Sequence, residues 1–169
     1  MKKAVGVLLG VAFCVTLLAG PAFALDKLAY VDLSRSFGEY NKTKDYDKVL
    51  GAKENVYTTE RDKKVEEIKQ FKEKYDLLSD KEKVAKKSDM EAKLKALQDF
   101  DRQKQTDLRK EQDEKMKEIL KDIEDAVKQV AEKEGYTMVF NDRVLVYQTK
   151  TLDISDKVLS ILNAKYVKK

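Results

Sequence analysis

Apolar side chains recur every three or four residues through the middle of the chain, which is the spacing of one face of an α-helix. Three such stripes follow one another: Ile68, Phe71, Tyr75 and Leu78; then Met90, Leu94 and Leu97; then Met116, Ile119, Ile123, Val127 and Val130. Neither Gly nor Pro occurs from Ala52 to Glu134, so intrinsic propensity favours helix throughout. The stretch is too long for one ordinary globular helix, and its stripes predict the seams of a coiled coil.

Two helix start signals interrupt the stripes. The segments Ser79-Asp80-Lys81-Glu82 and Ser88-Asp89-Met90-Glu91 both match the capping box, in which a Ser caps an exposed N–H and a Glu three residues later reaches back. A chain that ends one helix and begins another at a polar site folds back on itself. We therefore predict an antiparallel helical hairpin with its turn near Ser79, and with Ser88 either inside the second helix or at its start.

Outside this region the pattern changes to short apolar runs typical of strands. The run KLAYVDL predicts a buried strand, and YTMVFNDRVLVY predicts a β-hairpin whose strands are joined by residues 141–143. Gly135 fits the C-terminal cap of the long helix before it. The last stretch, LDISDKVLSILNAKY, predicts a helix with Asp153 or Ser155 as its N-cap.

These elements predict an α+β protein with three regions. Residues 25–45 and 131–169 form a small β-rich body, and residues 46–130 form a helical arm inserted between its strands, with a tip near residues 76–90. The expected core of the body and of its contacts with other copies is Leu28, Tyr30, Val31, Phe37, Val139, Val144, Val146, Val158 and Leu162. Because so small a body buries little apolar surface alone, we expect it to form an oligomer.

Residues 1–24 have the features of a secretory signal peptide. Two lysines precede an apolar run, and Ala22-Phe23-Ala24 forms a small-residue cleavage signal. The alternatives are a lipoprotein acylated at Cys14, which the bulky Phe13 opposes, and an uncleaved anchor, which the short apolar run opposes. We therefore expect export to the periplasm of a Gram-negative cell.

Removal of this leader restricts the chemistry that remains. The chain has 35 Lys and Arg against 31 Asp and Glu, and the leader takes two lysines, so the mature protein is nearly neutral at 33 against 31. It also loses its single Cys, and the chain has no His, which excludes zinc sites of the usual ligands, Cys nucleophiles and Ser-His-Asp triads. No phosphate-binding glycine loop occurs. We predict neither an enzyme nor a cofactor, and near neutrality argues against nucleic acid as a partner.

The seam of the predicted arm is thin. Asp101, Lys104, Asp107 and Glu111 stand where a strong coiled coil keeps apolar residues. Ordering the backbone costs roughly 1 to 2 kcal/mol per residue, which so few buried side chains offset only narrowly. We therefore expect the outer part of the arm to bend or open, which suits a clamp better than a rigid spacer.

The two ends of the chain resemble a known family. The V-D-x-S-R-x-F stretch from Val31 to Phe37, and the run that leads from Val146-Tyr147 to the helix start at residues 153–159, are similar to the Skp/OmpH-like periplasmic chaperones. The resemblance implies a jellyfish-shaped trimer, in which the bodies associate and three hairpins project around a cavity. It also implies that this cavity holds unfolded outer-membrane β-barrel proteins without ATP.

The arm then contains two sets of candidate contact residues. The basic set at the tip, for clients or for anionic lipid or lipopolysaccharide, is Lys81, Lys83, Lys86 and Lys87. The apolar set, for the seam or for clients, is Phe71, Tyr75, Leu78, Met90 and Leu94. Two alternatives remain open: the lysines form a plain solvated turn, or the protein is a periplasmic coiled-coil adaptor that binds no client.

Overall fold

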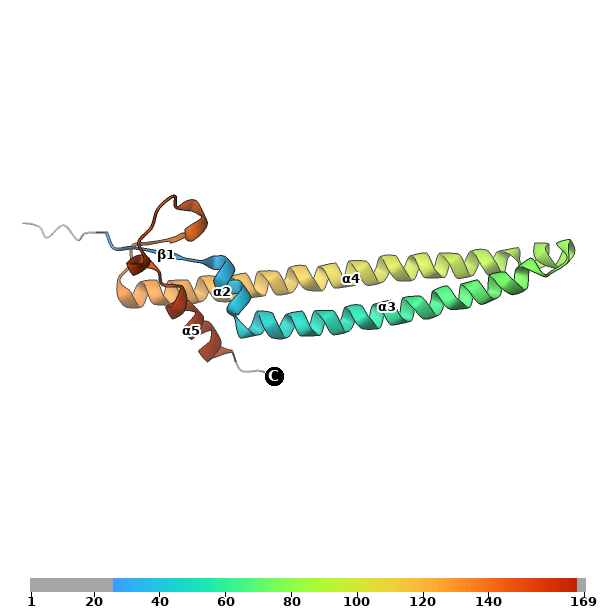
Figure 1. The fold of residues 1–169 in the computed structure, drawn as a ribbon, viewed down its shortest axis with the longest axis horizontal. Helices are drawn as coiled ribbons and strands as arrows, with labels where there is room; N and C mark the ends of the chain where they lie inside the picture. Colours follow the sequence, from blue (N-terminus) through green and yellow to red (C-terminus); the bar gives the residue numbers. More distant parts are fainter. Residues whose placement is uncertain (1–25, 167–169) are drawn as a thin grey trace, which may run out of the picture.

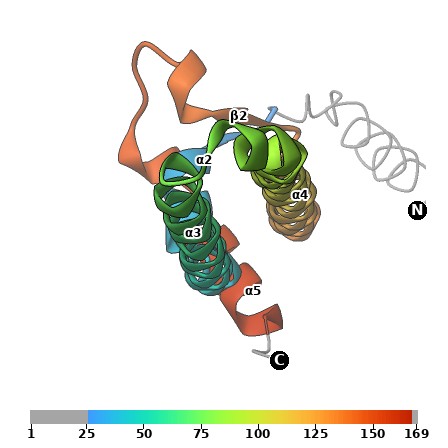
Figure 2. The same ribbon diagram turned by 90° about the vertical axis from the view of Figure 1, so that its right-hand side faces the viewer.

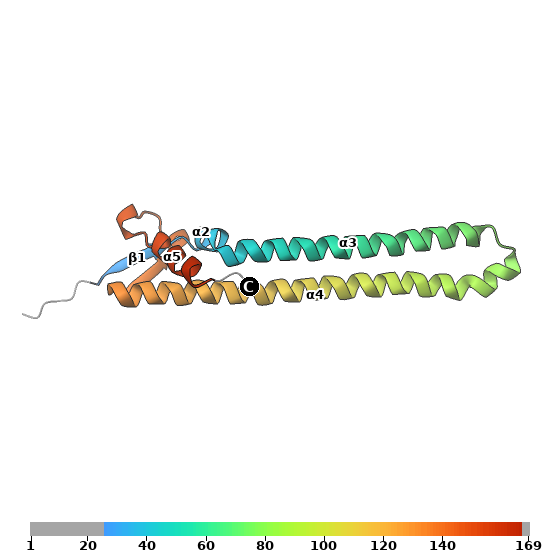
Figure 3. The ribbon, with the colours of Figure 1, turned by 90° about the horizontal axis from the view of Figure 1, so that it is seen from below.

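The computed structural model describes residues 26–166, so the predicted signal peptide lies outside the described residues. Two long antiparallel helices, α3 (Asn41–Asp76) and α4 (Asp80–Glu134), form a hairpin that extends from a small body at one end (Figure 1). Figure 3 shows the same helices lying alongside each other from the body to the turn. The predicted helical arm is therefore present in the fold.

The chain reverses direction at the first of the two predicted start signals. Ser79 precedes α4, and its N–H and hydroxyl both donate to a carboxylate oxygen of Glu82, with the N–H bond at 3.0 Å. These bonds lower the pKa of Glu82 and satisfy a donor at the start of the helix, where no intrahelical partner exists. Ser88 lies inside α4, because the helix is already established when the chain reaches it.

The strands pair differently from the prediction. β1 (Leu28–Val31) and β2 (Met138–Asn141) form a parallel two-stranded sheet, with Leu28 opposite Met138. The predicted β-hairpin is wrong, because the chain turns at once into a 3₁₀ helix, η2 (Asp142–Val144). The Asn141 side chain accepts from the Arg143 N–H at 3.3 Å, and this local bond ends the strand.

Short helices complete the body: α2 (Leu33–Glu39), η3 (Lys150–Leu152) and α5 (Ser155–Lys165). Gly135 ends α4 with a φ of 72°, a conformation that costs a residue with a side chain about 1 to 2 kcal/mol. The N-cap of α5 is Ile154 rather than either predicted residue. Asp153 nevertheless accepts from the Ser155 N–H at 2.8 Å, so its carboxylate performs the capping from one position earlier.

The core lies where the base of the arm meets β1 and α5. Its buried apolar side chains are Ala29, Val31, Tyr40, Ile119, Ile123, Ala126, Val130, Ile154, Val158 and Leu162. Residues 119–130, assigned to the arm from the sequence, therefore contribute four side chains to the core of the body. These residues reach the core because the C-terminal part of α4 continues into the body, past the level at which α3 begins (Figure 1).

Of the predicted core residues, Tyr30, Val31, Val158 and Leu162 are buried, and Phe37 and Val139 pack against the core. Leu28, Val144 and Val146 are exposed in one chain, so of the two predicted places only the contacts with other copies remain for them. Both valines were expected in the second strand of the predicted β-hairpin. Val144 instead ends η2, and Val146 follows it outside any strand. Leu28 lies on the outer face of the sheet, opposite the exposed Met138.

The V-D-x-S-R-x-F stretch joins the two ends of the chain. Asp32 accepts from the Arg35 N–H at 2.8 Å and so caps α2, while its own N–H donates to the Ser155 hydroxyl at 2.8 Å. The Arg35 guanidinium reaches Asp156 of α5 at 2.9 Å. These residues therefore fix β1 and α2 against the start of α5, which explains their spacing without a catalytic role.

Candidate functional site

The outer part of the arm has an apolar seam. The rings of Phe71 and Tyr75 stack with centroids 6.5 Å apart, and Lys93 of α4 lies over the Phe71 ring at 5.6 Å. Tyr75 also donates its hydroxyl to the backbone oxygen of Lys83 across the turn, at 3.1 Å. Contacts between the helices therefore continue to the end of the hairpin.

The predicted apolar set divides between two environments. Phe71, Tyr75, Leu78 and Met90 are half-buried, as expected of side chains near the seam. Leu94 is 46% exposed and therefore differs from the other four. It is available for contacts outside its own hairpin.

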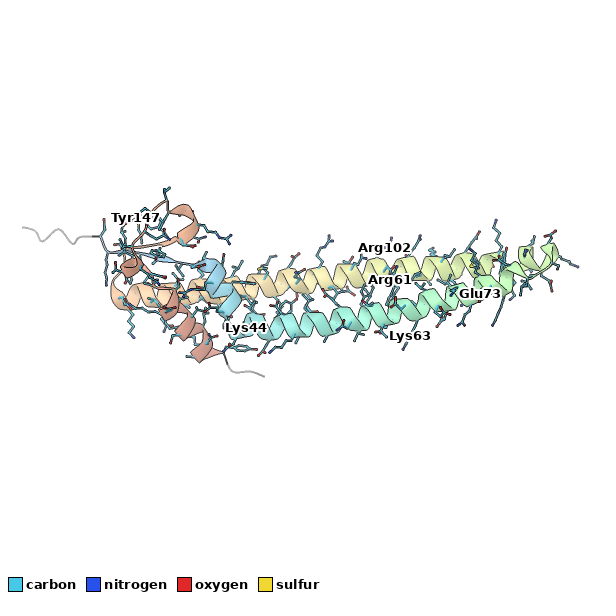
Figure 4. All side chains as sticks on the ribbon, in the orientation of Figure 1. Lys44, Arg61, Lys63, Glu73, Arg102 and Tyr147 are labelled. Carbon is cyan, nitrogen blue, oxygen red and sulfur yellow. The ribbon has the colours of Figure 1, made fainter. Side chains whose placement is uncertain are left out.

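The middle of the arm has a polar seam whose charges are paired. Asp101 accepts from the Tyr57 hydroxyl at 3.1 Å and from Arg61 at 3.3 Å, and Figure 4 shows Arg61 between α3 and α4. Lys53 reaches Glu111 at 2.6 Å. A second cross-helix pair joins Glu60 to Lys104 at 3.4 Å. Three of the four charged seam residues noted in the sequence thus bridge the helices, whereas Asp107 bonds to Gln103 of its own helix.

A charged cluster closes the base of the arm. Lys42 of α3 lies 2.7 Å from Glu118 and 2.6 Å from Asp122 of α4. Hydrogen bonds from Lys115 and then Lys42 lower the pKa of Glu118 to about 2. Burial, and then the Asp122 carboxylate, raise the pKa of Tyr40 to about 12, so its hydroxyl remains a donor to Asp122 at 3.1 Å.

The four predicted tip lysines are not equivalent. Lys86 pairs with Asp89 at 3.0 Å and Lys87 with Glu91 at 3.8 Å. Within residues 26–166, Lys81 and Lys83 make no ion pair. The free positive charge of this set is therefore concentrated in the first turns of α4.

Two apolar side chains at the tip were missed by the sequence analysis. Leu77, in the turn, is 88% exposed, and Val84, early in α4, is 78% exposed. Leu77 directly precedes Leu78, the last residue of the first apolar stripe. An apolar residue next to such a stripe, at a turn, is the sequence signal that could have identified it. The tip therefore presents apolar as well as basic chemistry.

The body exposes an apolar surface on the side away from α5. Figure 2 shows α5 on one side of the two long helices and the segment that follows β2 on the other. The exposed large apolar residues of the body are Leu28, Met138, Phe140, Val144, Val146, Tyr147 and Leu152. Figure 4 shows Tyr147 projecting from this segment. Large apolar side chains exposed in such numbers are typical of interaction surfaces.

A groove of about 850 Å³ lies at the base of the arm on the α5 side. Tyr40, Tyr46 and Val49 line it from the α3 side, and Leu162 and Tyr166 line it from the α5 side. Its rim is charged on both sides of the groove, with lysines and carboxylates interspersed. This mixture gives no convergent set of polar groups of the kind that fixes a small ligand.

No group of three or more potential ligands that could hold a metal ion occurs among residues 26–166. No helix in this range is long and apolar enough to cross a membrane. The candidate functional features described above are surfaces: the tip, the flanks of the arm and the apolar side of the body.

The chain matches a known protein family along most of its length. The family described as outer membrane protein (OmpH-like) matches residues 27–162. A candidate outer membrane chaperone (OmpH-like) from Caulobacter crescentus has a similar structure, with a TM-score of 0.77 and 16% sequence identity, covering 87% of this chain and 88% of that chain. At this identity the likeness establishes the fold alone. No curated protein matches the sequence.

Proposed function

We propose, since this chain belongs to the OmpH-like family of outer membrane proteins, that it is an ATP-independent periplasmic holdase chaperone. Its clients are unfolded outer-membrane β-barrel proteins, which it keeps from aggregating in a cavity between helical arms. The work is binding rather than catalysis. The signal peptide expected at residues 1–24 agrees with a periplasmic location.

The observation that best supports this proposal is the apolar surface left exposed along the arm and on the body. Leu77, Val84, Leu94, Met116 and Leu120 are all at least two-fifths exposed on one hairpin. Monomeric soluble proteins rarely leave large contiguous apolar areas uncovered. A protein that holds clients without fixed shape needs many weak apolar contacts, spread along its length rather than concentrated in one pocket.

Self-association into a trimer is part of the same proposal. The exposed face of the sheet and the segment after it, with Phe140, Val144, Val146 and Tyr147, lie at the end of the molecule opposite the tip. Covering this surface by equivalent surfaces of other copies would bury the side chains that one chain cannot bury. The arms would then project from a common base and enclose a cavity.

The competing interpretation is a periplasmic coiled-coil adaptor that holds no client. It accounts for a charged hairpin, but it gives no reason for apolar side chains exposed along the flanks. A coiled-coil spacer needs only a charged surface without exposed apolar side chains, because such a surface keeps it soluble. The exposed leucines and methionine therefore favour the chaperone.

Light scattering tests the proposal. A urea-denatured β-barrel protein is diluted into buffer with or without the mature chain, in the absence of nucleotide. We expect scattering to stay low with the chain present and to rise with an equal mass of serum albumin. Aggregation at the same rate in both samples would refute the chaperone and favour the adaptor.

Anionic lipid or lipopolysaccharide is a second candidate partner, favoured by the tip. Lys81 and Lys83, which form no ion pair within residues 26–166, are close in sequence to the exposed apolar Leu77 and Val84, a combination that suits a membrane surface. Each basic residue near an anionic surface contributes about 1 kcal/mol. Replacing all four tip lysines by Gln should abolish co-flotation with phosphatidylglycerol vesicles, while vesicles of phosphatidylcholine give the baseline. Undiminished flotation of the variant would assign the lysines to a solvated turn.

A further inference from the structure

The two flanks of α4 differ in chemistry along the length of the arm. One flank, here called the glutamine stripe, consists of Leu94, Gln98, Gln105, Gln112, Met116 and Leu120. Successive members are four or seven residues apart, so they share one face of the helix. None of the six is charged and all are exposed to solvent, while Arg102 and Arg109 lie beside them, four residues after Gln98 and Gln105. The flank is distinctive because it bears Leu94, Met116 and Leu120, three of the four large apolar side chains that α4 exposes.

The other flank of α4, here called the acidic stripe, has Gln103, Asp107, Glu114, Glu118 and Asp125 at the same spacing of four and seven. Lys110 and Lys121 lie between them and pair with Glu114 and Asp125. The acidic stripe contains no large apolar side chain. Glu118 and Asp125 line the groove beside α5, so the acidic stripe lies on the α5 side of the hairpin. The glutamine stripe is therefore on the opposite side, which is also the side of the segment after β2 that bears Val146 and Tyr147 (Figure 2).

The spacing within the glutamine stripe argues against a second helix as its occupant. Its apolar members, Leu94, Met116 and Leu120, are separated by 22 and then 4 residues. A helix that packed along this face would require apolar residues every three or four positions. The glutamines fill the interval instead, and each amide offers two donors and an acceptor.

An extended polypeptide fits this surface better. Its backbone presents unpaired N–H and C=O groups to the glutamine amides, and its apolar side chains find the leucines and the adaptable methionine at intervals. We infer that the glutamine stripe is the face of the arm that contacts the unfolded client, and that the acidic stripe faces away from it. This inference rests on the proposed function and adds the residues that perform it.

Gln103 and Gln105 provide a matched pair for the test. They are the same residue type, both exposed, two positions apart and about 200° apart around the helix. Each is replaced in turn by photoreactive p-benzoylphenylalanine in the full-length mature chain. After dilution of a urea-denatured β-barrel protein and irradiation, we expect severalfold more adduct with the client from position 105 than from position 103.

The outcomes separate this inference from the proposed function. If scattering shows that the client is held, but adducts form equally from both positions or mainly from 103, the inference is wrong and the chaperone stands. If position 105 reacts mainly with another copy of the chain, the stripe is an arm-to-arm contact, which also overturns the inference. If the client aggregates with the unmodified chain, the proposed function itself fails.

A substitution series gives an independent measurement. Leu94→Gln, Met116→Gln and Leu120→Gln together should raise the chain concentration needed for half-protection about tenfold, because apolar contact area is lost. The control is Val49→Gln with Val56→Gln, two α3 residues of similar exposure, of which Val49 lines the groove on the α5 side. The far-UV circular dichroism of both variants should match the parent. Equal losses of protection in correctly folded variants would contradict a preferred face.

Discussion

At the scale of single residues, charged side chains at the base of the arm are fixed by specific partners. Glu118 accepts from Lys115 and Lys42 at 2.6 and 2.7 Å, and its pKa falls to about 2 from an ordinary 4.5. A carboxyl group with a lowered folded-state pKa stabilises the fold above its unfolded pKa. That contribution disappears as the pH falls from about 4.5 through 2.

We therefore expect Glu118→Gln to lower the free energy of unfolding at pH 7 by about 0.5 to 1 kcal/mol, a value reduced for screening of a partly exposed pair. The difference from the parent should shrink as the pH falls through this window. Urea denaturation at a series of pH values measures it. Glu124→Gln, which alters an exposed residue with no ion pair among the described residues, is the control, and an identical pH course for both variants would contradict the assignment.

Replacement of two glycines by alanine should change the stability of the protein in opposite directions. Gly51 lies inside α3, and an added Cβ there would meet nothing within 4 Å, so Gly51→Ala should stabilise the protein by about 0.4 to 1 kcal/mol. Gly135 has a φ of 72°, and Gly135→Ala should destabilise it by about 1 to 2 kcal/mol. Thermal unfolding of the two variants checks the signs. A stabilising Gly135→Ala would mean that α4 ends differently.

At the scale of elements, the arm has two kinds of seam. Its outer part is apolar around Phe71 and Tyr75, whereas its middle depends on ion pairs such as those of Asp101 and Glu111. Thr58 and Thr59 in the middle also donate their hydroxyls to carbonyl oxygens one turn back, which favours bending. We therefore expect the middle of the arm to bend more readily than its outer part, whereas the sequence alone pointed to the outer part.

Salt should act selectively on this middle segment. Raising the salt concentration from about 0.05 to about 0.5 M screens exposed ion pairs but not apolar contacts. We expect amide hydrogen exchange in residues 53–61 and 101–111 to accelerate, while exchange around Phe71 and Tyr75 changes little. Residues 119–130 should stay protected, because they lie in the core. Uniform slow exchange along the arm at both salt concentrations would indicate a rigid spacer.

The elements also show which features a sequence pattern determines. Intervals of three and four predicted the helical hairpin, and the capping box at Ser79 marked its turn, because both signals are local. The pairing of the strands is not local: Met138 lies 110 residues from Leu28, and an apolar run does not specify its partner or direction. Cross-helix pairs such as Lys53 with Glu111 depend on the register of the hairpin, and charge composition alone could not identify them.

At the scale of the whole molecule, the apolar side of the body is the feature that one chain leaves uncovered. Val146 and Tyr147 are almost fully exposed there, and we predict that other copies cover them. Val146→Asp with Tyr147→Ser should convert a trimer to a monomer in sedimentation velocity, because a charge in an apolar contact is costly. Since both residues lie outside the core of one chain, circular dichroism should be unchanged. A trimer that persists in the variant would exclude this surface from the contact.

A scattering titration measures directly whether the chain keeps an unfolded β-barrel protein from aggregating. Increasing amounts of the mature chain are mixed with a fixed amount of a urea-denatured β-barrel protein, without nucleotide, and the scattering after dilution is recorded. We expect scattering to fall steeply and to reach its minimum near three chains per client, because the proposed trimer would enclose one client. Scattering that stays high at every ratio, or falls no faster than with serum albumin, would contradict the proposed function.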